Sequence, residues 1–210
     1  MFPLESVRLP GEDLPLRIFE PRYGALVREC LDGSREFGVV LIAAGREVGG
    51  ADARCDVGSM AHIVEYRDLG DGRYLLECEM RERIRVASWL DDDPYPRADV
   101  EVWPDEPGPT VTGDDIAVVE DRLMSIFDRV AAAQEATLPS RSEMLGEPEP
   151  GDDAGKRLYA LSSRVPMGQA DRYAVLEAPS ASARLDALRD AVETVAAMIE
   201  FQLADGGAPD

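Results

Sequence analysis

The sequence has very few of the side chains that enzymes use for proton transfer and nucleophilic attack. Among its 210 residues there is one histidine, His62, and one lysine, Lys156. A serine–histidine–aspartate site would have to use His62, and a serine–lysine dyad or a Schiff base would have to use Lys156. No Gly-x-Ser-x-Gly segment presents a serine, and an arginine follows Lys156 where a P-loop needs serine or threonine. We therefore expect no catalytic residues.

Cysteine pairs and metal-ligand spacings are also missing. The three cysteines, Cys30, Cys55 and Cys78, form no Cys-x-x-Cys pair, which argues against a disulfide framework and a structural zinc site. The aspartate runs at residues 91–93 and 152–153 lack the spacing of a calcium loop and fall in expected loops. We therefore expect three reduced, buried thiols, with no metal and no cofactor.

Long apolar runs and a basic surface are absent too. Residues 1–5 lack the basic and apolar regions of a signal peptide, and no run approaches the ~20 apolar residues that span a bilayer. Twenty-two basic residues face 42 acidic ones, a net charge of -20 that repels phosphate backbones and anionic membranes. We expect a cytoplasmic protein that binds neither nucleic acid nor membrane.

The first half of the sequence reads as short strands. Apolar or alternating segments predict strands over residues 39–42, 57–66, 73–79, 84–90 and 98–103. Asp71-Gly72 is typical of a hairpin turn, and glycines at positions 45, 49 and 50 indicate further turns. One helix is expected from Pro21 to near Gly33, since proline favours the first helical position. This pattern predicts a small barrel or sandwich with one helix.

The second half has helical periodicity. An apolar stripe from Ile116 to Val130 predicts a helix, with Thr112 and Asp115 as its capping box. Further helices are expected over residues 156–164 and 170–176 and from residue 180 onward, whereas residues 139–155 are expected to be mobile. We therefore predict an α+β chain with a barrel unit at 1–104, a linker at 105–112, a helical bundle at 113–204 and a disordered tail at 205–210.

Glu82 presents an open question within the predicted strands. If side chains alternate from Met80 through Ile84, Glu82 faces inward and needs a partner such as Arg22. Alternatively, a β-bulge turns Glu82 outward. We expect a structural ion pair, because a lone carboxylate makes a weak catalytic site.

Several segments together resemble a known family. The most specific is residues 14–23, which read Leu-Pro-Leu-Arg-Ile-Phe-Glu-Pro-Arg-Tyr. Others are residues 37–42, 56–61, 72–74, 83–86 and 94–98 in the first half, and 165–167, 176–179 and 184–185 in the second. In order and spacing these segments are similar to the substrate-binding (N-terminal) domain of Lon proteases.

The resemblance implies a PUA-like β pseudo-barrel followed by a helical bundle. It also implies recognition of unfolded or damaged protein segments, without the ATPase and peptidase domains of full Lon proteases. By the same resemblance, a ligand would contact the residues at the end of the most specific segment, which are Phe19, Glu20, Pro21, Arg22 and Tyr23.

These five residues also have structural interpretations. Glu20 can cap the helix, and Pro21 can start it. Phe19 and Tyr23 can fix the helix to the barrel, while Arg22 can neutralise a carboxylate such as Glu82.

Three functions remain open from the sequence. The leading one is a non-catalytic module that binds protein or peptide segments in an apolar groove between the barrel and the helices, or at a free strand edge. The second is an adaptor that docks on another protein through its acidic surface. The third is an enzyme with a cryptic site near His62. We expect a monomer or a weak dimer.

Overall fold

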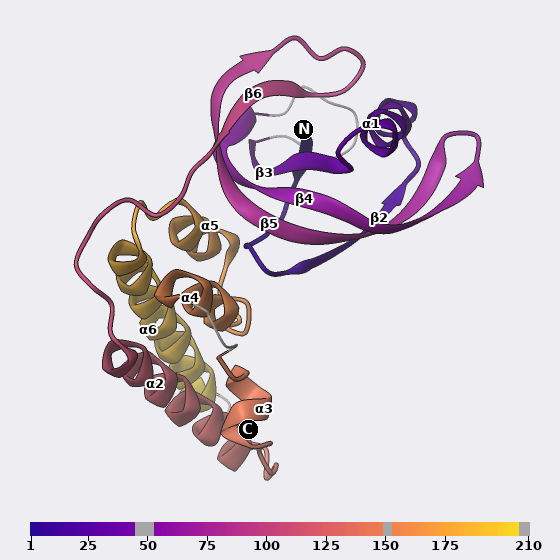
Figure 1. The fold of residues 1–210 in the computed structure, drawn as a ribbon. Coiled ribbons are helices and arrows are strands. Elements are labelled where there is room, and N and C mark those ends of the chain that lie inside the picture. Colours follow the sequence, from indigo (N-terminus) through magenta and orange to yellow (C-terminus); the bar gives the residue numbers. More distant parts are fainter. Residues whose placement is uncertain (45–52, 149–152, 206–210) are drawn as a thin grey trace. The chain divides into compact units, whose positions relative to one another are not determined.

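The structure, a computed structural model, describes residues 1–44, 53–148 and 153–205 (Figure 1). The chain divides into two units, Met1–Pro104 and Asp105–Asp210. Among the described residues, all strands and one helix lie in the first unit, and five helices lie in the second. This arrangement confirms the predicted α+β class. The turns expected at residues 45–50 lie outside the described residues, as do residues 206–210 of the tail expected at 205–210. The expectation is wrong for Asp205, which is the last residue of a helix.

Six strands form one mixed sheet in the first unit. The strand order is β1–β3–β4–β5–β2, and β6 also pairs with β5. β1 runs parallel to β3, whereas the other pairs are antiparallel. Their bounds are β1 (Phe2–Leu4), β2 (Asp13–Ile18), β3 (Glu36–Ala44), β4 (Ala53–Gly70), β5 (Arg73–Leu90) and β6 (Arg97–Val102).

The hairpin of β4 and β5 organises this sheet. Its turn is Asp71-Gly72, with φ of 55° and 71°, as a type I′ turn requires, which confirms the predicted hairpin. The strands predicted over 73–79 and 84–90 prove to be one strand, β5. It pairs with β2 through residues 74–79 and with β6 through residues 84–90, so one long strand serves two neighbours.

A β-bulge separates these two stretches of β5 and explains Glu82. On β4, Ser59 and Ala61 lie two residues apart, yet their partners Arg83 and Met80 lie three apart. The extra residue breaks the alternation of side chains, so Glu82 is exposed. The inward-facing alternative is therefore wrong, and the bulge alternative is confirmed.

Arg83 is the buried charge on this part of the sheet. Its Nε donates to the Trp103 carbonyl at 3.0 Å, and its Nη2 donates to the Pro104 carbonyl at 3.3 Å. The Trp103 ring centroid lies 4.0 Å from the Arg83 guanidinium carbon and 3.4 Å from that of Arg85. Arginine stacks favourably on aromatic faces, so these contacts fasten the end of β6 to β5.

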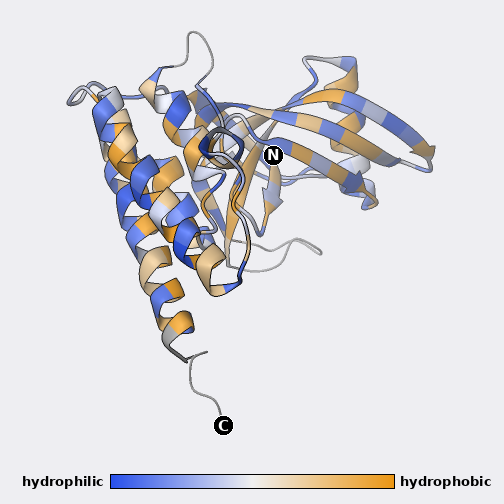
Figure 2. Ribbon diagram, turned by 90° about the horizontal axis from the view of Figure 1, so that it is seen from below, coloured by the Kyte–Doolittle hydropathy of each residue, from blue (hydrophilic) through white to orange (hydrophobic). Residues whose placement is uncertain are grey.

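The core of the first unit lies between one face of the sheet and α1 (Pro21–Asp32). Side chains alternate along β5, with Tyr74, Leu76, Cys78 and Met80 buried and the residues between them exposed. Figure 2 shows this alternation as bands of opposite hydropathy along the strands. A second, smaller cluster contains Met1, Val40, Ile84 and Val86.

The second unit is helical. Its helices are α2 (Gly113–Ala133), α3 (Arg141–Leu145), α4 (Ala154–Ser162), α5 (Gln169–Glu177) and α6 (Ala181–Asp205). The capping box predicted for α2 is confirmed: the Asp115 N–H donates to the Thr112 hydroxyl at 3.2 Å, and the Thr112 N–H donates to the Asp115 carboxylate at 3.0 Å. Within the described residues, no helix is long and apolar enough to cross a bilayer.

Helix α3 lies in a stretch for which the sequence predicts mobility. The Ser140 N–H donates to the Glu143 carboxylate at 2.8 Å, and the Glu143 N–H donates to the Ser140 hydroxyl at 3.4 Å. Leu145, only 1% exposed, anchors the helix. The expectation for residues 139–155 is therefore wrong for α3 and for the start of α4. Residues 149–152 lie outside the described part of the chain.

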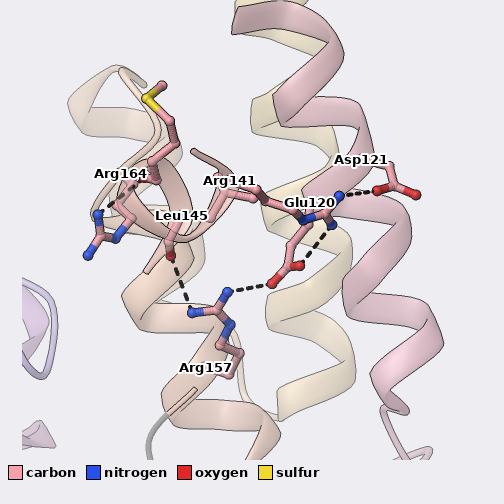
Figure 3. Close-up of polar contacts among 7 residues, drawn as sticks. Glu120, Asp121, Arg141, Leu145, Arg157 and Arg164 are labelled. Atoms are coloured by element: carbon pink, nitrogen blue, oxygen red, sulfur yellow. Dashed lines mark hydrogen bonds and ion pairs between the residues drawn. The ribbon is translucent and has the colours of Figure 1, made fainter. Parts of the chain in front are cut away.

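Two arginines hold α3 against its neighbours (Figure 3). Arg157 donates to the Glu120 carboxylate at 2.5 Å and to the Leu145 carbonyl at 3.3 Å. Arg141 donates to Glu120 at 2.9 Å and to Asp121 at 2.5 Å. Burial raises the pKa of Glu120, but hydrogen bonds from Arg157 and Arg141 outweigh burial and hold that pKa below its usual value.

Helices α2 and α6 run side by side in the same direction. Ion pairs along them join residues whose numbers rise together: Asp115 with Arg189 at 3.6 Å, Arg122 with Glu193 at 2.7 Å, and Arg129 with Glu200. Buried apolar residues of α2 and α6 supply the core of the unit, including Leu123, Ile126, Leu188 and Val192.

The chain entering the second unit is also fixed. Arg184 of α6, 1% exposed, donates to the two oxygens of Asp105 at 2.9 and 2.5 Å. Its guanidinium carbon lies 3.9 Å from the Tyr159 ring centroid. The first residue of the predicted linker is therefore bound to the helical unit.

Candidate functional site

A groove lies in the first unit between the two end strands of the sheet, which do not pair with each other. β1 and β2 are the ends of the strand order, and residues of both line one cavity of about 220 Å³. The turn into α1 completes it. The lining residues are Phe2, Pro3, Leu4, Pro15, Leu16, Arg17, Ile18, Phe19, Glu20 and Tyr23.

The groove is bordered by buried aromatic side chains. The Phe2 ring centroid lies 4.3 Å from that of Tyr23 and 6.0 Å from that of Phe37. These three residues, together with Leu4 and Ile18, belong to the main core of the unit. An apolar group that enters the groove therefore meets packed aromatic and aliphatic side chains.

The groove side of β2 offers backbone groups to a partner. The Met80 N–H donates to the Glu12 carbonyl at 2.8 Å, which fixes the phase of the ladder with β5. Backbone N–H and carbonyl groups alternate in direction along an antiparallel strand. Those of residues 14, 16 and 18 therefore point toward β5, whereas those of Asp13, Pro15 and Arg17 point away from it. Pro15 lacks an N–H and tolerates this outward position.

Three of the five residues expected at the site line this groove. They are Phe19, Glu20 and Tyr23. Phe19 is 59% exposed at the rim and is free to contact a ligand, whereas Tyr23 is 5% exposed and packs into the core. Pro21 is the first residue of α1 and, like Arg22, does not line the groove.

Arg22 positions its neighbours rather than neutralising Glu82. Its Nε donates to the Glu20 carboxylate at 3.0 Å, and its guanidinium carbon lies 4.5 Å from the Tyr23 ring centroid. Glu20 occupies the N-cap position but makes no side-chain cap hydrogen bond. The expected capping role is therefore wrong, because Arg22 engages the carboxylate instead.

Close packing fixes α1 beside the groove. A Cβ atom on Gly24 would lie 2.3 Å from the carbonyl oxygen of Gly72 in the β4–β5 turn. Only glycine permits this approach of helix to turn. The contact sets the position of Tyr23, and with it one wall of the groove.

His62 lies away from the groove, on β4. Its Nδ1 is 3.7 Å from a Glu36 oxygen, and Arg81 binds the same oxygen at 3.1 Å. Within the described ranges, no three His, Cys, Asp or Glu side chains gather as metal ligands would. Asp92 is paired with Arg54 at 2.7 Å, and Asp153 caps α4 by accepting from the Lys156 N–H at 2.8 Å.

A second cavity, of about 470 Å³, lies in the helical unit. Glu120, Arg141, Leu145 and Arg157 are among its lining residues. Three of its charged groups, Glu120, Arg141 and Arg157, already bind one another across α2, α3 and α4 (Figure 3). These three residues therefore serve to hold the helices together.

Sequence reasoning missed the strand residues of the groove. Leu14, Leu16 and Ile18 alternate with polar or proline positions, a pattern that predicts a strand once Pro15 is placed on a free edge. β1 has only three residues and carries no comparable pattern. It pairs with β3, which is distant in the sequence, so no local pattern indicates this pairing.

Comparison with known proteins places the chain in a family. A family model described as the ATP-dependent protease La (LON) substrate-binding domain matches residues 1–194. Lon protease 1 of Herpetosiphon aurantiacus is 26% identical over 186 residues, which are 87% of this chain and 22% of that protein. A LON peptidase N-terminal domain and RING finger protein of Schizosaccharomyces pombe is 27% identical over 104 residues, 44% of this chain and 21% of that protein.

Solved structures agree with this placement. A Lon N-terminal domain protein from Xanthomonas campestris has a TM-score of 0.60 and 25% identity, covering 90% of this chain and 95% of that one. The N-terminal domain of a Mycobacterium avium complex Lon protease shares the fold, with a TM-score of 0.57, 15% identity and coverage of 90% and 94%. The chain spans about a fifth of the length of the curated relatives that it matches. The resemblance seen in the sequence is confirmed, and the chain belongs to the LON substrate-binding domain family.

Proposed function

We propose that the chain is a non-catalytic module that binds exposed or unfolded polypeptide segments in the groove between β1 and β2. Membership of a substrate-binding domain family supports a binding role. The observation that carries the proposal is an apolar groove bordered by the two end strands of the sheet. An extended peptide can pair with such a strand edge while its side chains enter the groove.

The size of the groove favours a peptide over a small molecule. Pockets for small molecules usually enclose roughly 300–1,000 Å³. The groove measures about 220 Å³, which suits one or two side chains of a chain that continues outside it. Phe19 at the rim supplies exposed apolar surface for such a chain to cover.

The placement of the ionisable residues supports the absence of catalysis. His62 and Lys156 do not line the groove. The groove carboxylate, Glu20, is engaged by Arg22. Burial raises the pKa of Cys30 to about 11 and that of Cys78 to about 12, which disfavours the nucleophilic thiolate of both.

Peptide titration with two matched variants tests the proposal. Phe19 and Val102 are each 59% exposed in the same unit, but only Phe19 lines the groove. Fluorescence anisotropy of a labelled, extended peptide rich in valine should show saturable binding. Phe19→Ala should weaken it about tenfold, the loss expected when roughly 1.4 kcal/mol of apolar contact is removed. Val102→Ala should leave it unchanged.

Two results would contradict the proposal. One is the absence of saturable binding by the parent protein. The other is an equal loss of affinity in Phe19→Ala and Val102→Ala, because it would place the peptide outside the groove.

A further inference from the structure

The outer face of the sheet beside the groove carries an arginine row on a strongly acidic protein. Arg17 of β2 lies opposite Leu75 of β5, and Leu75 lies opposite Arg67 of β4. Directly opposed residues on neighbouring strands point to the same face, so the three side chains form one row. All three are exposed, Leu75 by 38%.

The two arginines of this row are not engaged by carboxylates. Within the part of the chain that the structure describes, neither Arg17 nor Arg67 takes part in an ion pair or a side-chain hydrogen bond. This is unusual for a chain with 42 acidic residues against 22 basic ones. The row on one side contains Pro15, Glu77 and Glu65. On the other side, Arg73 lies two residues before Leu75 on the same exposed face of β5 and is 3.5 Å from Asp71.

Arg17 also stands at the free edge of the sheet. Its backbone N–H and carbonyl face away from β5, and it lines the groove. A peptide strand that pairs with this edge places one residue directly opposite Arg17. The side chain of that residue lies beside Arg17 on the outer face, so the row then runs across the peptide, β2, β5 and β4.

We infer that the groove selects peptide segments in which an acidic residue lies between two apolar ones. This inference rests on the proposed function and names its substrate class. The acidic side chain pairs with Arg17 on the outer face. The residues on either side of it point to the opposite face, toward the apolar groove, because side chains alternate along a strand.

Three peptides that differ at one position test the selection. End-blocked, fluorescein-labelled Thr-Val-X-Val-Thr peptides carry Glu, Gln or Lys at X. An opposite-charge cross-strand pair contributes up to about 1 kcal/mol, which corresponds to about fivefold in Kd. The Glu peptide should therefore bind about fivefold more tightly than the Gln peptide, and the Lys peptide should bind most weakly.

Charge reversal supplies the decisive comparison. Arg17→Glu should invert the order, so that the Lys peptide binds most tightly. Arg28→Glu is the matched control: Arg28 is exposed on α1, does not line the groove, and its reversal changes the net charge equally. It should preserve the parental order.

The outcomes separate this inference from the proposed function. Equal binding of the three peptides, or the same change of preference in both variants, overturns the inference and leaves the proposed function standing. No saturable binding of any peptide contradicts the proposed function, and the inference falls with it.

Discussion

At the scale of single residues, buried arginines explain how an acidic chain packs its interior. Arg83, Arg157 and Arg184 are each less than 10% exposed. Arg157 and Arg184 bind carboxylates, and Arg83 binds carbonyls and an aromatic ring. Composition alone did not identify these partners. The alternation in the sequence suggested Glu82 as a buried charge. Because of the bulge, Glu82 is exposed and Arg83 is buried instead.

The ion pair of Glu120 with Arg157 should appear in the pH dependence of stability. Glu120→Gln leaves a buried guanidinium without its charge partner, so the free energy of unfolding should fall by about 2 kcal/mol at pH 7. Folding lowers the pKa of Glu120. Its contribution is therefore complete above the unfolded pKa of about 4.3 and is lost as the pH falls through the folded value. Urea denaturation from pH 7 to pH 3 should show the difference between parent and variant shrinking below about pH 4.

A surface pair provides the control for this measurement. Glu193 pairs with Arg122 at 2.7 Å, but its side chain is 60% exposed. Glu193→Gln should cost less than about 1 kcal/mol at pH 7. Equal losses in the two variants would show that burial does not strengthen the Glu120 pair.

At the scale of elements, patterns that lie within one segment were predictable. The Asp71-Gly72 turn, the helix at Pro21 and the capped start of α2 each follow from neighbouring residues. β2 and α3 were missed although each has a local pattern. Pro15 obscured the alternation of β2, and the Pro- and Glu-rich surroundings hid the capping box at Ser140.

Substitution at Gly24 tests the contact between α1 and the β4–β5 turn. Gly24→Ala normally favours a helix, but here the added methyl group meets the Gly72 carbonyl at 2.3 Å. Overpacking of this kind costs about 1–3 kcal/mol. The urea midpoint should therefore fall. Gly113→Ala, on α2 with no atom within 4 Å of the new Cβ, should leave the midpoint unchanged or raised. Equal midpoints for both variants would contradict the packing described for α1.

At the scale of the whole chain, the change from strand to helical periodicity near residue 105 predicted the α+β organisation. The groove was not predictable in the same way. It brings residues 2–4 beside residues 15–23 through the sheet order, with β3, β4 and β5 between the two ends. Such long-range pairing leaves no local pattern in the sequence. The family resemblance suggested a site at residues 19–23, and three of these residues, Phe19, Glu20 and Tyr23, line the groove.

Thiol reactivity reports on the integrity of the strand unit. Cys30 and Cys78 are buried, as expected, and have raised pKa values. The expectation of a buried thiol is wrong for Cys55, which is half-buried. Iodoacetamide at pH 8 should therefore modify about one thiol per folded chain and three in urea. Cys55→Ser should abolish the reaction of the folded chain. Equal reactivity of all three thiols in the folded protein would contradict the described core.

The proposal that peptides bind beside β2 is tested most directly by mapping backbone amides. In an NMR titration with the end-blocked Glu peptide, the amides of Asp13 and Arg17 should shift and become protected from hydrogen exchange, because both face away from β5. Amides of β1 and Phe19 should shift as well. The amides of Leu14 and Leu16, already bonded to β5, should gain no protection. Saturable shifts confined to the helices of the second unit, with β1 and β2 unchanged, would contradict the proposed site.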